Sequence, residues 1–508
     1  MDTFLTPRLS RFFKLKHLKN TYSSLFSVGE IEKSTTLQMG LGASLLMLFV
    51  SFSLYIRNNS FTVGAFEHNA HLCWPHFLDC GKLYLFNALP IGYSHNIFFM
   101  LLFAVMVFAA YRIWQRKWVS AHMLITSLWI VQALITFVFT IHFSASVVYY
   151  QIVLTAALLF LPHKLFFFKF IFVLLYFLSA TIKFHEGWIA GTFFTSLQTG
   201  LPLIPDTFAP IATWIVIISQ TFGAWLLLSQ RLLLQRIEFF FLLLFHLYSG
   251  IFILFWFPLV TIPYLLIFFG PLYEVSKVPL DRKSLAGWTT ALVLICLQLF
   301  PFIFIPGDQK YTLEGSRYGL FLFDANRQCI IESTVFYSDG SQSATEIKGS
   351  QRRSGCDPYL IWFRLTNQCQ RLGTAVARIE WKHDLSINGG SFYRVVDVPN
   401  VCDLKYRPFS HNEWIRTPDL GASAISPARK NIYPVGVGYD SFVSVSYDTE
   451  NEPPILGGVM TKRAELTSLQ RFIIDRMNIL VIIWWLMWLG TLVVLFLRHI
   501  LIPLTQRR

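Results

Sequence analysis

The chain has 508 residues, of which 54% are hydrophobic and only 14% are charged. Soluble globular proteins contain about 25% charged residues, so this composition excludes an ordinary soluble fold. The net charge of +13 comes from Lys and Arg residues that lie between apolar runs. A nucleic-acid-binding protein would gather them on one soluble face, so we expect no nucleic-acid partner and take membrane lipids as the main surroundings.

The first 34 residues form a basic segment that precedes the first apolar run. They include Arg8, Arg11, Lys14, Lys16 and Lys19. The segment is too long and too polar to be the start of a signal peptide. We expect residues 1–34 to remain uncleaved in the cytoplasm.

Long apolar runs dominate the next part of the chain. A membrane-spanning helix needs about 20 mostly apolar residues. Runs of this kind begin near Thr36, His95, Ser120, Ser146, Leu165, Ile211, Glu238, Ala286 and Leu480. A shorter run, Pro258 to Leu272, follows the seventh. If the short run also crosses, the sequence predicts an all-α polytopic helix bundle of about ten crossings.

Loop charge gives the orientation of these crossings, because cytoplasmic loops retain Lys and Arg. Ten crossings, counted from a cytoplasmic N-terminus, place the following basic residues on the cytoplasmic side: Arg112, Arg116, Lys117, Lys164, Arg231, Arg236, Lys277, Arg282, Lys283, Arg498, Arg507 and Arg508. We therefore predict a multi-pass cell-membrane protein with both termini in the cytoplasm. Residues 35–306 form the transmembrane bundle, residues 307–471 an extracytoplasmic domain, and residues 472–508 the last helix and a cytoplasmic tail.

The segment 307–471 is rich in Asp, Ser, Gly and Asn. Three short alternating stretches, Tyr311 to Phe323, Thr374 to Trp381 and Phe442 to Tyr447, are typical of β-strands between turns. We expect a small, mainly β domain inserted before the last helix.

Six of the seven cysteines fall on the predicted outer side, and Cys296 lies within an apolar run. The six are Cys73, Cys80, Cys329, Cys356, Cys369 and Cys402. Since an oxidising compartment converts such thiols into disulfides, we expect all six to be paired, with a connectivity that spacing does not give. A zinc site is the alternative at Cys73 and Cys80, which have His68, His71 and His76 around them, but no tight CxxC pair favours it, and we expect no metal.

Ionisable residues inside a membrane protein are candidates for function because they are costly to bury there. The fifth apolar run ends at Lys183 and continues into His185, Glu186, Trp188 and Gly191. The following stretch, up to Pro210, is too apolar for an exposed loop and too interrupted by Gly and Pro for a helix, so we expect a re-entrant segment at the outer surface. There Lys183 would be a desolvated amine that can accept a proton, or a lysine that extends to the lipid headgroups.

His246 is a second candidate, near the middle of the seventh run. A single histidine in a helix bundle is more often a hydrogen-bonded packing residue than a catalytic group. The residue pattern alone therefore leaves its role open.

Four motifs in order resemble the vitamin K-dependent γ-glutamyl carboxylase family and its bacterial relatives, which share the horizontally transferred transmembrane domain. They are K-x-x-x-x-W-x-x-G at Lys183 to Gly191, the Phe245-His246 pair, the stretch CGKLYLFNALP at Cys80 to Pro90, and YTLEGSRYG at Tyr311 to Gly319. The resemblance covers roughly residues 35 to 325.

This family carboxylates protein glutamates while it oxidises a quinol to an epoxide, and a lysine deprotonates the quinol. The resemblance implies that Lys183 is this base, that His185, Glu186, Trp188, Gly191 and His246 line the site, and that a reduced quinone is the cofactor. The chain differs where the family has a histidine near the outer start of the fourth helix, because Ser144 to Tyr150 contain none. The resemblance therefore covers the base but not the whole carboxylation cycle.

Two other functions are compatible with the sequence. A non-catalytic membrane scaffold would use the outer domain to bind a protein or peptide partner for export, envelope assembly or toxin maturation. A transporter would be favoured by paired charges on facing helices or by an inverted repeat, and we find neither in the sequence.

Overall fold

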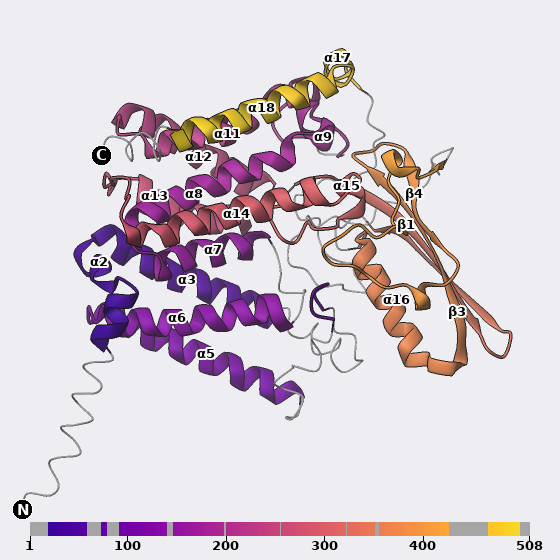
Figure 1. Cartoon of the computed structure of the whole chain (residues 1–508), viewed down its shortest axis with the longest axis horizontal. Coiled ribbons are helices and arrows are strands. Elements are labelled where there is room, and N and C mark those ends of the chain that lie inside the picture. The colour runs from indigo at the N-terminus through magenta and orange to yellow at the C-terminus, as the bar shows by residue number, and fades with distance from the viewer. Residues whose placement is uncertain are drawn as a thin grey trace, which may run out of the picture.

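The computed structural model describes residues 19–57, 73–78, 91–139, 146–197, 200–253, 256–321, 323–350, 355–425 and 466–497. A helix bundle forms one end of the molecule and a β domain the other (Figure 1). The motif at Cys80 to Pro90 and the expected strand Phe442 to Tyr447 lie outside the described residues.

Each of the ten apolar runs is helical. The helices are α3 (Thr35–Arg57), α5 (Ile91–Trp114), α6 (Trp118–Leu134), α7 (Ser146–Phe160), α8 (Lys164–Ala180), α11 (Ala209–Thr221), α12 (Leu232–Phe252), α13 (Trp256–Phe269), α14 (Leu285–Phe304) and α18 (Met477–Phe496). A short helix, α2 (Val28–Lys33), precedes them at the end of the bundle away from the β domain (Figure 1).

Eight helical stretches in the described part of the chain are long and apolar enough to cross a membrane. They are Thr35–Ser53, Ile97–Trp114, Trp118–Val138, Lys164–Lys183, Asp206–Leu228, Leu232–Phe252, Arg282–Phe304 and Met477–Val494. Val147–Phe160 and Phe257–Phe269 are apolar but shorter. Large apolar side chains such as Met100, Val107 and Leu486 are exposed on these helices, as expected of a surface that faces lipid.

Helix α8 is the centre of the bundle. In its apolar stretch 89% of the residues are buried, against 11% in α18. Because α8 is apolar on every side, with Phe, Leu, Ile and Val at most positions, it is suited to a helix enclosed by other helices. The indole ring of Trp488 from α18 stacks on Phe177 of α8 with ring centres 4.4 Å apart.

The stretch after α8 is irregular and buried, as expected from its composition. A 3₁₀ turn, Thr181–Lys183, leads into two short helices, α9 (Glu186–Ile189) and α10 (Thr192–Thr195), and a 3₁₀ turn at Asp206–Phe208 precedes α11. Residues 187–197 are buried.

The β domain contains one antiparallel sheet with strand order β2-β1-β3-β4-β5. Its strands are β1 (Arg327–Tyr337), β2 (Gln342–Ser350), β3 (Val376–Ile387), β4 (Phe392–Val398) and β5 (Ala424–Ile425). Alternate residues of β3, namely Ile379, Trp381, His383 and Leu385, are buried. Helix α16 (Pro358–Leu372) packs with its apolar first half in the same core.

Strand predictions were partly wrong. The described residues of the stretch Tyr311 to Phe323 belong to the end of the short helix α15 (Gln309–Thr312) and to the turns after it, instead of a strand. The reason is local: Asp308 caps α15 by accepting from the Lys310 backbone N–H, which favours a helical turn. Thr374 to Trp381 lies mostly in β3.

Two disulfides are present in the β domain, Cys329–Cys356 and Cys369–Cys402. Both tie the region of α16 to the sheet, since Cys329 is in β1 and Cys402 follows β4. Cys73 is also disulfide-bonded, and Cys80 lies outside the described residues. Cys296 has a free thiol in α14. The predicted disulfide bonding is thus confirmed for the four cysteines of the β domain.

Candidate functional site

Lys183 ends the 3₁₀ turn after α8, and its side chain is only 4% exposed. Its Nζ donates to the carbonyl oxygen of Ser179 at 2.8 Å and lies 5.1 Å from the centre of the Trp188 ring. A lysine ammonium can donate three hydrogen bonds, and within the described residues Ser179 is its one hydrogen-bond acceptor. A charged amine with so few partners is costly to bury, and the group has capacity left for a further molecule.

Lys164, at the other end of α8, is the natural comparison. We expected it in a cytoplasmic loop, but it is fully buried. Its Nζ donates to the carbonyl oxygens of Leu158 and Leu159 at 2.8 Å and of Leu161 at 3.2 Å. All three donor positions are used, so this lysine stabilises the end of α7 by satisfying carbonyls that the helix leaves unpaired.

His185 is the N-cap residue of α9, and one nitrogen of its ring is buried without a hydrogen-bond partner in the described structure. Nδ1 accepts from the Gly187 backbone N–H at 3.0 Å. Burial of the ring, reinforced by the positive charge of Lys310, holds the pKa of His185 well below its usual value. The neutral ring therefore carries its proton on Nε2, which is buried and without a hydrogen-bond partner in the described structure. Glu186 is exposed at the edge of the same turn.

Trp188 and Gly191 give the K-x-x-x-x-W-x-x-G spacing a structural meaning. The Trp188 ring covers the Lys183 amine, and its Nε1 donates to the Phe323 carbonyl oxygen at 2.5 Å. Gly191 has φ +72°, and a Cβ atom there would lie 2.8 Å from the backbone nitrogen of Pro210. The motif thus brings together the Lys183 amine, the Trp188 ring that covers it, and the close approach of Gly191 to Pro210.

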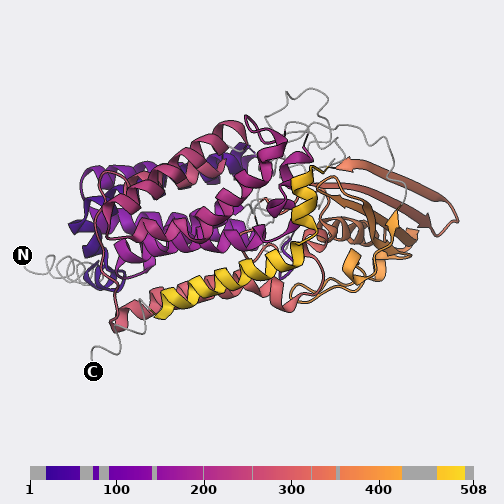
Figure 2. The ribbon, with the colours of Figure 1, turned by 90° about the horizontal axis from the view of Figure 1, so that it is seen from above.

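The β domain contacts this turn directly. Gln298 of α14 donates to the Thr181 hydroxyl at 3.0 Å and accepts from the Leu320 backbone N–H at 2.6 Å. Asn326 donates to the Phe193 carbonyl oxygen. Figure 2 shows α17 (Ser468–Ile474), in yellow, where the bundle meets the β domain.

His246 is not part of this cluster. It is fully buried in α12, and its Nε2 is hydrogen-bonded to the Tyr176 hydroxyl. Tyr176 lies seven residues before Lys183, or about 10 Å along a helix axis. His246 therefore lies about two helical turns deeper in the bundle, where it packs with Tyr176 and Phe257.

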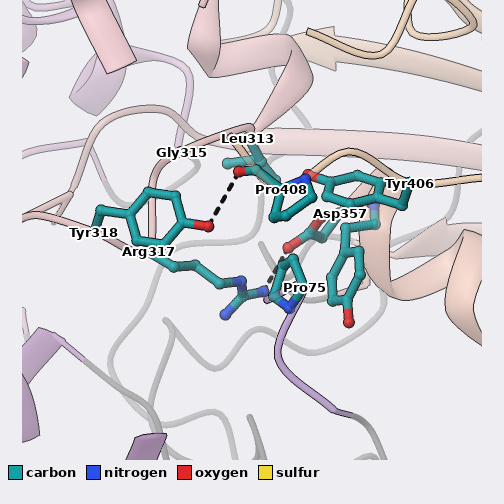
Figure 3. Close-up of a pocket in the computed structure, with 9 residues that line it drawn as sticks. Pro75, Leu313, Gly315, Arg317, Tyr318, Asp357, Tyr406 and Pro408 are labelled. Atoms are coloured by element: carbon teal, nitrogen blue, oxygen red, sulfur yellow. Dashed lines mark hydrogen bonds and ion pairs between the residues drawn. The ribbon is translucent and has the colours of Figure 1, made fainter. Parts of the chain in front are cut away.

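A separate pocket lies at the base of the β domain (Figure 3). It is a small, partly open hollow, and it shares no residue with the Lys183 turn. Arg317 is paired with Asp357 at 2.5 Å. Burial raises the pKa of Tyr318 to about 12, and its hydroxyl donates to the Pro408 carbonyl oxygen at 3.0 Å.

No protein-family model, no curated protein and no solved structure matches this chain. The Lys183 turn offers a buried amine, a neutral imidazole N–H and an aromatic wall, a set that can take a proton from an apolar molecule and bind the resulting oxygen.

Four buried ionisable residues of the apolar helices were not predicted as candidates. Lys164 was interpreted as a loop charge, His122 and Lys169 were not considered, and Glu238 was noted only as the start of an apolar run. Each occupies an apolar helical stretch, so the rule that singled out Lys183 would have found all four.

Proposed function

We propose that this chain is a ten-crossing membrane enzyme whose Lys183 amine acts as a base at the outer face. The two shorter helices, α7 and α13, bring the number of crossings to ten; α7 packs against α8, and α13 packs against α12 and α3. The β domain contains two disulfides. Because disulfides persist in oxidising compartments, they support an outward orientation of this domain.

The observation on which this proposal rests is the geometry of Lys183. Its amine is buried, has one hydrogen bond, and lies against Trp188. This arrangement suits proton abstraction from a lipid-soluble acid, and the motif's resemblance to the vitamin K-dependent carboxylases favours a quinol. The quinol O–H bond breaks, the proton bonds to Nζ, and the electron pair stays on the oxygen. His185 Nε2–H can donate to that oxygen.

The proposed chemistry stops at deprotonation of the quinol and its two-electron oxidation to the quinone by dissolved dioxygen, which is reduced to hydrogen peroxide. Protein carboxylation would need further groups, and the histidine of the family's fourth helix has no counterpart at Ser144 to Tyr150. A carboxylated protein substrate is therefore not part of the proposal.

The test uses the full-length protein in lipid nanodiscs with reduced vitamin K in air-saturated buffer, and follows the quinol, quinone and epoxide by chromatography. We expect Lys183→Met to reduce turnover by about 10²- to 10⁴-fold, the usual contribution of a general base. Lys164→Met is the matched control, because it removes a buried lysine of the same helix that has no donor to spare.

Chemical rescue separates a base from a packing residue. In Lys183→Ala, added methylamine should restore part of the turnover, because a small amine can occupy the space and accept the proton. If Lys183→Met turns over at the wild-type rate, Lys183 is not the base. If the wild-type protein neither binds nor oxidises the quinol, the substrate class is wrong.

The pocket in Figure 3 favours a second candidate, a scaffold that binds a protein or peptide on the outer side. Its Arg317 guanidinium and its three tyrosines, Tyr318, Tyr359 and Tyr406, are residue types enriched at the energetically important positions of binding surfaces. Under this hypothesis Arg317→Ala would abolish cellular function while Lys183→Met would leave it unchanged, the reverse of the enzyme hypothesis.

A further inference from the structure

A helix break lies inside one of the membrane-spanning stretches. The apolar stretch Asp206–Leu228 is long enough to span, but α11 ends at Thr221 and the chain continues as a 3₁₀ helix over Gly223–Leu228. Irregular backbone at membrane depth occurs where it is buried in protein or lines a cavity. In transporters such breaks commonly form ion sites.

A carboxylate from the neighbouring helix lies directly on this break. Glu238 of α12 is 5% exposed, and its Oε1 accepts from the Ser219 hydroxyl at 2.9 Å. A Cβ atom on Gly223 would lie 2.5 Å from Glu238 Oε2 and 3.0 Å from Oε1. Only glycine therefore allows both carboxylate oxygens to approach the backbone this closely.

Two cations of the bundle, Arg236 and Lys169, have other partners. Arg236 donates to the Phe269 carbonyl oxygen at 3.2 Å, and its guanidinium lies 5.8 Å from the Phe239 ring centre. Lys169 donates to the Glu274 carbonyl oxygen. In the described residues Glu238 has no ion pair with Lys, Arg or His.

The negative charge of the Glu238 carboxylate therefore needs a positive partner. A buried carboxylate without a cation is costly, and the C-terminal end of α11 adds the partial negative charge of a helix terminus. Gln235, one turn before Glu238 on the same buried face of α12, adds an unpaired and fully buried side-chain oxygen, Oε1. Its amide nitrogen is already used, since it donates to the Phe269 carbonyl oxygen at 2.6 Å.

We propose that Glu238, Ser219, Gln235 and the backbone at Gly223, where α11 gives way to the 3₁₀ helix, form an intramembrane site for a monovalent metal cation. All the donors are oxygens, the ligands that hard cations such as Na⁺ prefer, whereas sites for softer transition metals use His or Cys. A single carboxylate matches a single positive charge. This site is independent of the Lys183 turn and of the enzyme proposal.

The test measures thermal unfolding of the detergent-solubilised full chain by intrinsic tryptophan fluorescence in NaCl, KCl and choline chloride at equal ionic strength. A cation that binds the folded state stabilises it in proportion to its occupancy. We expect NaCl to raise Tm above the choline value in the wild type and in Lys183→Met, and to have no such effect in Glu238→Gln. Glu314→Gln, which alters a buried carboxylate of the β domain, should keep the response.

Ser219→Ala provides a second variant if Glu238→Gln does not fold. It removes one ligand, so the Na⁺ concentration that gives half of the Tm increase should rise several-fold. The proposal is overturned if the wild type unfolds at the same temperature in NaCl, KCl and choline chloride. It is also overturned if Tm depends on pH alone, since the carboxyl would then bind only a proton, or if Ser219→Ala and Glu238→Gln both keep the wild-type response.

Discussion

His383 should make the β domain unstable in mild acid. It is fully buried in β3, and neither ring nitrogen has a hydrogen-bond partner among the described residues. Its cross-strand neighbours are the apolar Ile331 in β1 and Val396 in β4, and the Trp381 ring stacks beside it with centres 6.2 Å apart. A proton on this ring would place a charge in an apolar core.

Burial lowers the pKa of His383 from its usual 6.5 to about 3. The unfolded chain therefore binds a proton below about pH 6.5 that the folded chain does not accept until about pH 3, and stability falls as pH falls through this window. From roughly pH 7.5 to pH 5 the loss is about 2 kcal/mol, and the full shift corresponds to about 5 kcal/mol. His383→Leu should remove this loss and cost little at neutral pH, because it replaces two unpaired polar atoms by apolar ones.

Hydrogen exchange followed by mass spectrometry can measure this effect in peptides from β1 and β3. The free energy of local opening should fall by about 2 kcal/mol between roughly pH 7.5 and pH 5 in the wild type but not in His383→Leu, after correction for the intrinsic exchange rates. His411→Gln is the control, because His411 has a carboxylate partner in Glu314 at 2.8 Å and its loss should not remove the acid response. If wild type and His383→Leu lose protection equally, His383 does not cause it.

Three further changes should lower the free energy of unfolding. Gly191→Ala should lower stability by about 1–3 kcal/mol, because φ is +72° and the new Cβ would meet Pro210; thermal unfolding of the purified protein checks it. Removing both Cys369 and Cys402 opens a link between residues 33 apart and should cost about 3–4 kcal/mol, measured as earlier urea unfolding of the β domain. Gln298→Leu leaves the buried Leu320 N–H without its acceptor and should cost about 1–3 kcal/mol, with increased proteolysis at the junction.

The helices could be predicted from sequence because their cause is local. A run of about 20 apolar residues is helical in lipid whatever its neighbours are, since only a helix satisfies its own backbone. The ten runs were therefore located correctly. The segment Tyr311 to Phe323 was assigned wrongly because alternation was given more weight than the capping residue Asp308, which starts a helix.

The candidate site was only partly accessible to sequence reasoning. Lys183, His185 and Trp188 are close in the chain, so their proximity in the turn could be expected. Gln298 and Phe323 reach the same turn from α14 and from the start of the β domain, and nothing in their local sequence indicates this. Packing between segments more than a hundred residues apart determines which of these groups meet.

The two lysines at the ends of α8 show why residue type and burial do not by themselves give a function. Both are buried, and both donate to carbonyl oxygens at a helix end. Lys164 uses all three donor positions on the end of α7, so its role is complete without another molecule. Lys183 uses one on Ser179, and the rest of its surroundings are Trp188 and the apolar turn that the β domain covers. If the amine served only to cap α8, Lys183→Ala would change stability, and added methylamine would not restore turnover. Rescue of turnover by methylamine is therefore the measurement that distinguishes a base from a cap.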